Sequence, residues 1–112
     1  FGTGPLGLFS VQMARIMGAV NIVMVGLEED VAVRFPIAKE LGATAVVNGS
    51  TEDVVTRCQE ICGKDNLGLV IECSGAIALL VYFVISFSQL RMRYIMRGEG
   101  SEIRLRLWLY PC

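Results

Sequence analysis

The sequence predicts an α/β fold in which helices cover a parallel sheet. Two observations carry this prediction. First, a glycine-rich turn with the pattern G-x-G-x-x-G occupies residues 1–7, directly before an apolar, helix-forming segment. Second, short β-branched runs alternate with amphipathic helical segments as far as residue 76. This alternation is typical of a parallel sheet whose strands are joined by right-handed crossover helices.

The glycine-rich turn is expected to hold a phosphate group. Gly2 allows a tight turn out of a strand, Gly4 leaves room for a pyrophosphate, and Gly7 lets the next helix pack closely. The helix would then present free N–H groups and the positive end of its dipole to the anion. The motif alone is weak evidence, because it also requires a preceding strand, which would lie before Phe1.

The first helix and strand follow directly. Apolar residues at helical spacing predict a helix over residues 8–17, and Gly18 is a natural residue to end it. The run 21–25 is β-branched and almost entirely apolar, which predicts a parallel strand buried on both faces. This strand is expected to close at Gly26.

A second helix is expected before residue 42. Its clearest part is residues 37–41, and Asp30 is expected to cap it. Because proline disfavours helix at the residue before it, the regular helix is predicted to start at Pro36, with residues 31–34 forming a loose turn.

A further strand, helix and strand complete the alternation. The strands are predicted at residues 45–47 and 69–73. Between them, apolar residues at helical spacing predict a helix over residues 54–62. Ser50 and Asp53 resemble a capping box at the start of this helix.

The last third of the chain has a different composition. Residues 77–87 carry no charge, but this run is shorter than the roughly 18 residues of a membrane span, so it predicts a buried helix or strand. Residues 89–100 contain three arginines and are expected to form a solvated connection. Residues 103–110 alternate apolar and polar side chains, as in a half-buried antiparallel or edge strand.

The length and net charge of the chain limit the classes of function that it can have. A chain of 112 residues suits one domain with one modest core. Its net charge of -1 gives no electrostatic footprint for nucleic acid or for an anionic membrane surface. The N-terminus shows no charged region followed by a cleavage site, so a cytoplasmic location is expected.

The four cysteines do not suggest a metal site. None of them forms a C-x-x-C pair, and the chain has no histidine. Cys58 and Cys62 lie four residues apart on the predicted third helix, where a disulfide or half of a ligand set is one interpretation. Small buried apolar residues are the preferred interpretation, since free cysteine usually behaves in this way.

Four blocks of sequence resemble the cofactor domain of medium-chain, zinc-type alcohol and polyol dehydrogenases, including sorbitol- and threonine-dehydrogenase-like members. The resemblance covers residues 2–76, and the four blocks in their order are more specific than the glycine motif alone. The matching stretches are residues 2–8, 17–19, 38–44 with 47–48, and 70–76.

The resemblance implies a Rossmann fold that binds a nicotinamide dinucleotide. Gly26 stands where NAD-preferring relatives carry an acid for the adenosine ribose, and Arg34 matches a basic residue beside the same ribose. Cys73 and Ser74 match the stretch under the nicotinamide ribose, with ordinary packing at a strand end as the alternative. The residues implied at the pyrophosphate are Gly2, Gly4, Pro5, Leu6 and Gly7.

The chain also departs from this family. The first Rossmann strand, the catalytic domain and the zinc ligands would all lie before Phe1, so no catalytic or metal-binding residue is assigned to this chain. After Ala76 the family pattern fades, and a changed reading frame, a splice or gene-prediction artefact and true divergence all remain open. Residues 1–76 are therefore interpreted as a partial NAD(P)-binding domain and residues 77–112 as a divergent tail.

The implied function is the cofactor-binding portion of an oxidoreductase that moves a hydride between a secondary alcohol or polyol and a nicotinamide cofactor. The alternatives are a non-catalytic nucleotide-binding module and a truncated product without function. The chain alone is expected to be inactive, and the complete enzyme is expected to bind a small alcohol, use zinc in its missing domain and form a homo-oligomer. NADP is favoured over NAD, because Gly26 leaves room for a 2′-phosphate that Arg34 would contact, although Glu28, Glu29 or Asp30 would favour NAD.

Overall fold

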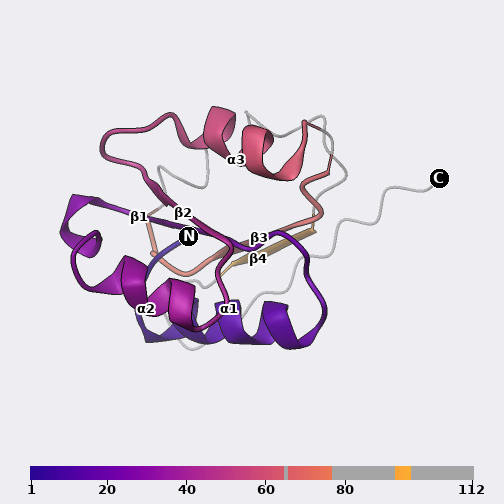
Figure 1. The fold of residues 1–112 in the computed structure, drawn as a ribbon, viewed down its shortest axis with the longest axis horizontal. Helices are drawn as coiled ribbons and strands as arrows, with labels where there is room; N and C mark the ends of the chain where they lie inside the picture. Colours follow the sequence, from indigo (N-terminus) through magenta and orange to yellow (C-terminus); the bar gives the residue numbers. More distant parts are fainter. Residues whose placement is uncertain (65, 77–92, 97–112) are drawn as a thin grey trace.

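The strands form one layer of the molecule, with helices on both sides. The computed structural model describes residues 1–64, 66–76 and 93–96 (Figure 1). Helices α1 and α2 lie on one side of the strands and α3 lies on the other, which confirms the predicted α/β class (Figure 1). In chain order the elements are α1 (Pro5–Ile16), β1 (Val23–Gly26), the 3₁₀ helix η1 (Glu28–Asp30), α2 (Arg34–Glu40), β2 (Ala45–Asn48), α3 (Val54–Cys62), β3 (Leu69–Glu72) and β4 (Arg93–Met96).

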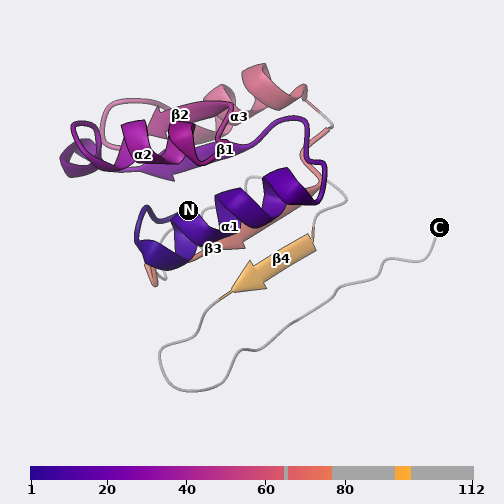
Figure 2. The same ribbon diagram turned by 60° about the horizontal axis from the view of Figure 1, so that its bottom comes forward.

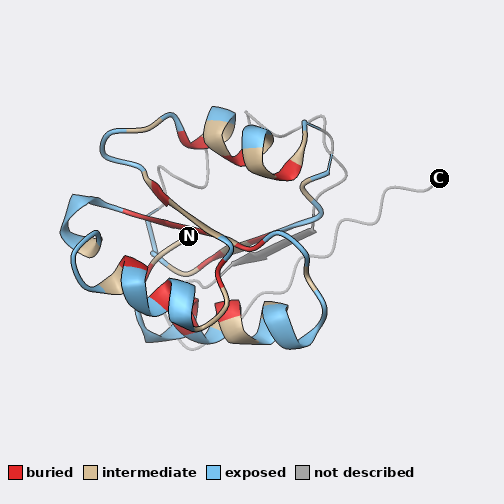
Figure 3. Ribbon diagram, in the orientation of Figure 1, coloured by how far each residue is buried: buried red, intermediate tan, exposed pale blue. Residues whose placement is uncertain are grey.

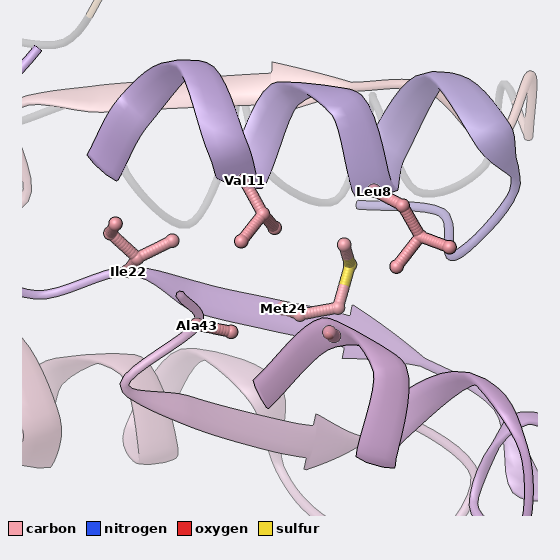
Figure 4. Close-up of a cluster of buried hydrophobic side chains, with 6 residues drawn as sticks. Leu8, Val11, Ile22, Met24 and Ala43 are labelled. Atoms are coloured by element: carbon pink, nitrogen blue, oxygen red, sulfur yellow. The ribbon is translucent and has the colours of Figure 1, made fainter. Parts of the chain in front are cut away.

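Strand β1 is covered on both faces, as its apolar sequence predicted. On one face Met24 packs in a cluster with residues of α1 and α2, including Leu8 and Val11 (Figure 4). On the other face Val25 packs in a second cluster beneath α3. Figure 3 shows the buried residues gathered on the strands and on the inner sides of the helices. The second cluster consists of Val25, Val47, Val54, Cys58 and Val70.

The strands form two separate parallel pairs. β1 pairs with β2, with Val23 opposite Ala45, and β3 pairs with β4, with Leu69 opposite Arg93. Within the described ranges β1 and β3 do not pair with each other. In the classical Rossmann strand order, the first strand lies in this gap.

Phe1 and Gly2 bridge one end of this gap. The backbone nitrogen of Phe1 donates a hydrogen bond to the carbonyl of Ile71 at 2.6 Å, and the amide of Cys73 donates to the carbonyl of Phe1 at 2.8 Å. On the other side, the amide of Gly2 donates to the carbonyl of Val25 at 3.1 Å. Behind this bridge a cavity of about 500 Å³ opens between β1 and β3, lined by both strands and by the cysteines of α3.

The structure corrects one prediction for the tail. Residues 93–96, expected within a solvated connection, form strand β4, which lies beyond β3 on the side away from β1 (Figure 2). Tyr94 and Ile95 favour extended backbone, and β3 offers this segment a row of backbone hydrogen-bonding groups. The predictions for residues 77–87 and 103–110 fall outside the described residues.

Two helix starts also differ from the predictions. Helix α1 begins at Pro5 rather than at residue 8, because proline is well suited to the first turn of a helix. Helix α2 begins at Arg34, so Pro36 is its third residue rather than its first. At that position the missing N–H breaks no helical hydrogen bond, since the first N–H groups of a helix have no internal partner.

The predicted caps of α2 and α3 were wrong in detail. Asp30 ends η1 and accepts a hydrogen bond from the amide of Leu27 at 2.8 Å, instead of capping α2. Asp53 caps α3 by accepting from the amide of Thr56 at 2.8 Å. Ser50 takes no part in that cap, because its hydroxyl accepts from the amide of Glu28 at 3.1 Å.

None of the helices in the described part of the chain combines the length and the apolar character that crossing a membrane requires.

Candidate functional site

The glycine turn before α1 is closely packed at two of its three glycines. Gly2 has φ +91°, and a Cβ atom there would lie 2.7 Å from the amide nitrogen of Ser74. A Cβ atom on Gly7 would overlap the carbonyl oxygen of Gly2. The turn, the start of α1 and the end of β3 therefore approach closely enough to exclude side chains at these two positions.

Gly4 is different, because its Cβ position faces open space. Apart from Gly4 itself and its neighbours along the chain, no atom of the described residues lies within 4 Å of that position. Gly4 is the N-cap of α1, and the first turn of α1 carries no acidic residue. The first hydrogen bond of the helix runs from the amide of Leu8 to the carbonyl of Gly4 at 3.0 Å. The N–H groups of Leu6 and Gly7 come before it in the chain, so they have no acceptor within the helix. Pro5 has no N–H to offer. This geometry leaves an open anion-binding position at the N-terminus of α1, beside Gly4.

The end of β3 forms a tight turn around a buried carboxylate. Glu72 accepts hydrogen bonds from the amide of Ser74 at 2.6 Å, from the Ser74 hydroxyl, and from the amide of Gly75 at 3.2 Å. The Ser74 hydroxyl in turn accepts from the amide of Ala76 at 3.1 Å. This network holds Cys73 and Ser74 beside Gly2, so two separate parts of the predicted site meet.

The end of β1 lies on the other side of the glycine turn. Around Gly26 a Cβ atom would lie 2.6 Å from the Thr3 side chain, 2.7 Å from Asp30 Oδ2 and 2.8 Å from the Phe35 ring. Thr3 donates a hydrogen bond to Asp30 Oδ1 at 2.6 Å and is only 6% exposed. Sequence reasoning missed Thr3 altogether, although a hydroxyl between two motif glycines was a visible signal.

Arg34 is less closely tied to the site. It is the first residue of α2 and is half-buried. Its side chain forms neither a hydrogen bond nor an ion pair with the residues that the structure describes; the ion pairs there join Arg57 to Glu52 and Glu60. Its guanidinium therefore has no partner in the described structure that would compete with a ligand.

The cysteines of α3 are buried apolar residues, as the preferred interpretation held. Burial raises the pKa of the Cys58 thiol to about 11, and burial also raises the pKa of Cys62. Both line the cavity between β1 and β3, and both are free thiols. Among the described residues no group of three or more His, Cys, Asp or Glu side chains is placed to hold a metal ion. This part of the chain therefore does not fit a zinc ion.

The comparisons with known proteins identify the family. The pattern of the zinc-binding dehydrogenases matches residues 5–85, and the chain belongs to that family. The zinc-type alcohol dehydrogenase-like protein YdjL of Escherichia coli K12 is 93% identical over 110 residues, which cover 98% of this chain and 28% of YdjL. The D-xylulose reductase of Saccharomyces cerevisiae is 38% identical over 82 residues, covering 68% of this chain and 22% of the reductase.

A solved structure agrees with this assignment. The alcohol dehydrogenase zinc-binding domain protein of Burkholderia ambifaria superposes with a TM-score of 0.73 at 31% identity, covering 93% of this chain and 28% of that protein. The parallel strands described above are thus those of the Rossmann-like domain of alcohol dehydrogenases. The chain spans between a fifth and a third of the length of these dehydrogenases.

A shorter stretch of the chain is similar to a protein of another class. Over 42 residues it is 76% identical to the gamma-aminobutyric acid permease of Escherichia coli K12. These residues cover 38% of this chain and 9% of the permease.

Proposed function

We propose that residues 1–76 form the nicotinamide-dinucleotide site of an oxidoreductase that transfers a hydride between a secondary alcohol or polyol and NAD(P). The main observation behind this proposal is the open anion-binding position at Gly4. It lies at the N-terminus of α1, where the carboxyl ends of β1 and β3 meet the glycine turn, and dinucleotides bind at this crevice in open α/β sheets. The dehydrogenase and reductase relatives support the reaction class.

Each part of the chain has a distinct role in this proposal. The N–H groups of Leu6 and Gly7 bind the pyrophosphate, while Gly2, Gly4 and Pro5 shape the turn around it. Cys73 and Ser74 lie beneath the nicotinamide ribose, held there by Glu72. Gly26 and Arg34 lie toward the adenosine ribose, where the sequence favours NADP over NAD. The bound cofactor accepts or donates the hydride, and the protein positions it.

The remaining functions belong to a longer enzyme. The alcohol substrate and the catalytic zinc would be bound outside this segment, because the described residues hold no cluster that fits a metal. We propose a cytoplasmic enzyme, with the nicotinamide dinucleotide and a small alcohol as its ligands and with self-association into a homo-oligomer. Neither nucleic acid nor a membrane has a role in this proposal.

A titration with reduced cofactor tests the proposal. We expect saturable enhancement of NADH or NADPH fluorescence by the 112-residue chain. The variant Gly4→Val places a side chain in the open anion-binding position and should weaken binding of the reduced cofactor at least about tenfold. The matched control is Gly68→Val, because the Cβ position of Gly68 also faces open space but lies away from the glycine turn. Equal loss in both variants, or no binding to a folded wild-type chain, would contradict the proposal.

A further inference from the structure

We propose that Asp30 is the residue that recognises the adenosine ribose, and that it selects NAD over NADP. This inference rests on the proposed dinucleotide site and names a specificity residue within it. It opposes the preference for NADP that Gly26 and Arg34 suggested in the sequence. The observation behind it is the position of the Asp30 carboxylate at the carboxyl end of β1.

The Asp30 carboxylate occupies the space into which a side chain at position 26 would project. Oδ2 lies 2.7 Å from the place where a Cβ atom on Gly26 would stand. An acid on the strand itself therefore cannot fit, and an acid from the following 3₁₀ helix is present instead. A ribose-binding acid in a Rossmann domain lies at this end of the second strand of the fold, which β1 represents here.

Two hydrogen bonds fix the orientation of this carboxylate. Oδ1 accepts from the Thr3 hydroxyl at 2.6 Å, and Oδ2 accepts from the amide of Leu27 at 2.8 Å. Thr3 belongs to the glycine turn, so the Asp30 carboxylate is hydrogen-bonded directly to the turn that is proposed to bind the pyrophosphate. The acid does not need to swing toward the site.

The fixed carboxylate still has capacity to bind a ligand. An ionised carboxylate offers about four acceptor positions, and Thr3 and Leu27 use two of them. Asp30 is half-buried rather than enclosed. The two remaining positions suit the two hydroxyl donors of a ribose diol.

A 2′-phosphate in the same place would meet a negative charge that cannot turn away. Glu29, in the same 3₁₀ helix, is exposed and takes no part in the hydrogen bonds that fix Asp30. Arg34 is the nearest basic residue along the chain and is the first residue of the following helix, α2. The carboxylate at the strand end should therefore outweigh Arg34, because charge repulsion and lost hydrogen bonds both act against the phosphate.

The experiment compares NADH and NADPH binding by fluorescence titration. It uses the 112-residue chain and also full-length YdjL carrying residues 1–76 of this chain in place of its matching segment. We expect NADH to bind about ten to a hundredfold more tightly than NADPH. In Asp30→Asn this ratio should fall at least tenfold, whereas the control Glu29→Gln should keep it. A thermal melt of each variant checks that it folds.

A second pair of variants covers the case in which Asp30→Asn does not fold. Thr3→Val removes the donor that orients Asp30 and should reduce the preference for NADH, while Thr3→Ser should retain it. Tighter binding of NADPH to the wild type would overturn the inference and leave the dinucleotide site intact. An unchanged ratio in folded Asp30→Asn would also overturn it. Binding of neither cofactor in either host would instead contradict the proposed function.

Discussion

The carbonyl oxygen of Phe1 accepts a hydrogen bond from the amide of Cys73 at 2.8 Å, in the same manner as a residue of a neighbouring parallel strand. One residue later, Gly2 makes the corresponding contact with Val25 on the opposite side of the gap. The backbone at Phe1 is thus already aligned for a strand between β1 and β3. Along the rest of the gap the inner edges of both strands face the cavity rather than each other.

We predict that a strand added before Phe1 stabilises the chain. The change is an extension by the five residues that precede the matching segment in YdjL. Burying the added side chains in the cavity and pairing two strand edges, less the conformational entropy lost in ordering five residues, should raise the free energy of unfolding by about 2–5 kcal/mol. Urea denaturation followed by circular dichroism measures this. A five-residue Gly-Ser extension is the control, and an equal effect from both extensions would refute the prediction.

The two motif glycines Gly4 and Gly7 should respond differently to the same substitution. Gly7→Ala should cost about 3 kcal/mol or more of stability, because its methyl group would overlap the carbonyl of Gly2. Gly4→Ala should change stability by less than about 1 kcal/mol, since its methyl group meets open space. Thermal melts of both variants measure the difference. Similar losses in the two variants would contradict the difference in packing between Gly4 and Gly7.

Cys58 should make the stability of the fold sensitive to alkaline pH. Burial raises its pKa from 9.0 to about 11, so the folded chain keeps the thiol proton at pH values where the unfolded chain releases it. The resulting stabilisation is complete below pH 9 and is lost as the pH rises to 11, a change of at most about 2–3 kcal/mol. Urea denaturation at several pH values tests this. Cys58→Ala should show a flatter decline over the same interval, and an unchanged slope would contradict the assignment.

We predict that the 112-residue chain does not oxidise alcohols. Its described residues bring together no ligand set for a metal. The chain would therefore bind the cofactor without supplying a metal ion to activate the substrate. The measurement is cofactor reduction with secondary alcohols and polyols in the presence of zinc. A full-length polyol dehydrogenase in the same buffer provides the positive control. Turnover that a zinc chelator abolishes would disprove the prediction.

The elements that the sequence predicted best are those with strong periodicity. Helix α3 begins and ends where its apolar spacing indicated, and its predicted face, with Val54, Cys58 and Cys62, is buried. Strand β1 was recognised from an apolar β-branched run, because only a strand covered on both faces tolerates such a sequence.

The features that the sequence did not reveal depend on contacts between distant residues. Strand β4 forms because β3, more than 20 residues earlier, offers it a backbone edge. The sequence of residues 93–96 does not by itself indicate that β3 is its partner. Likewise, Asp30 was interpreted as a helix cap because Thr3, which binds its carboxylate, lies 27 residues away. Only the family resemblance assigned the glycine turn and Cys73–Ser74 to one site, and in the structure Gly2 lies against the backbone of Ser74.

The turn that follows β3 has a kinetic consequence. Because Glu72 already binds the backbone of Ser74 and Gly75, the segment that would contact the nicotinamide half is ordered before any ligand arrives. A preorganised contact surface loses little conformational entropy when it is occupied. Association at this end of the site should therefore be a single, concentration-dependent step, limited by encounter rather than by a slow rearrangement of the protein.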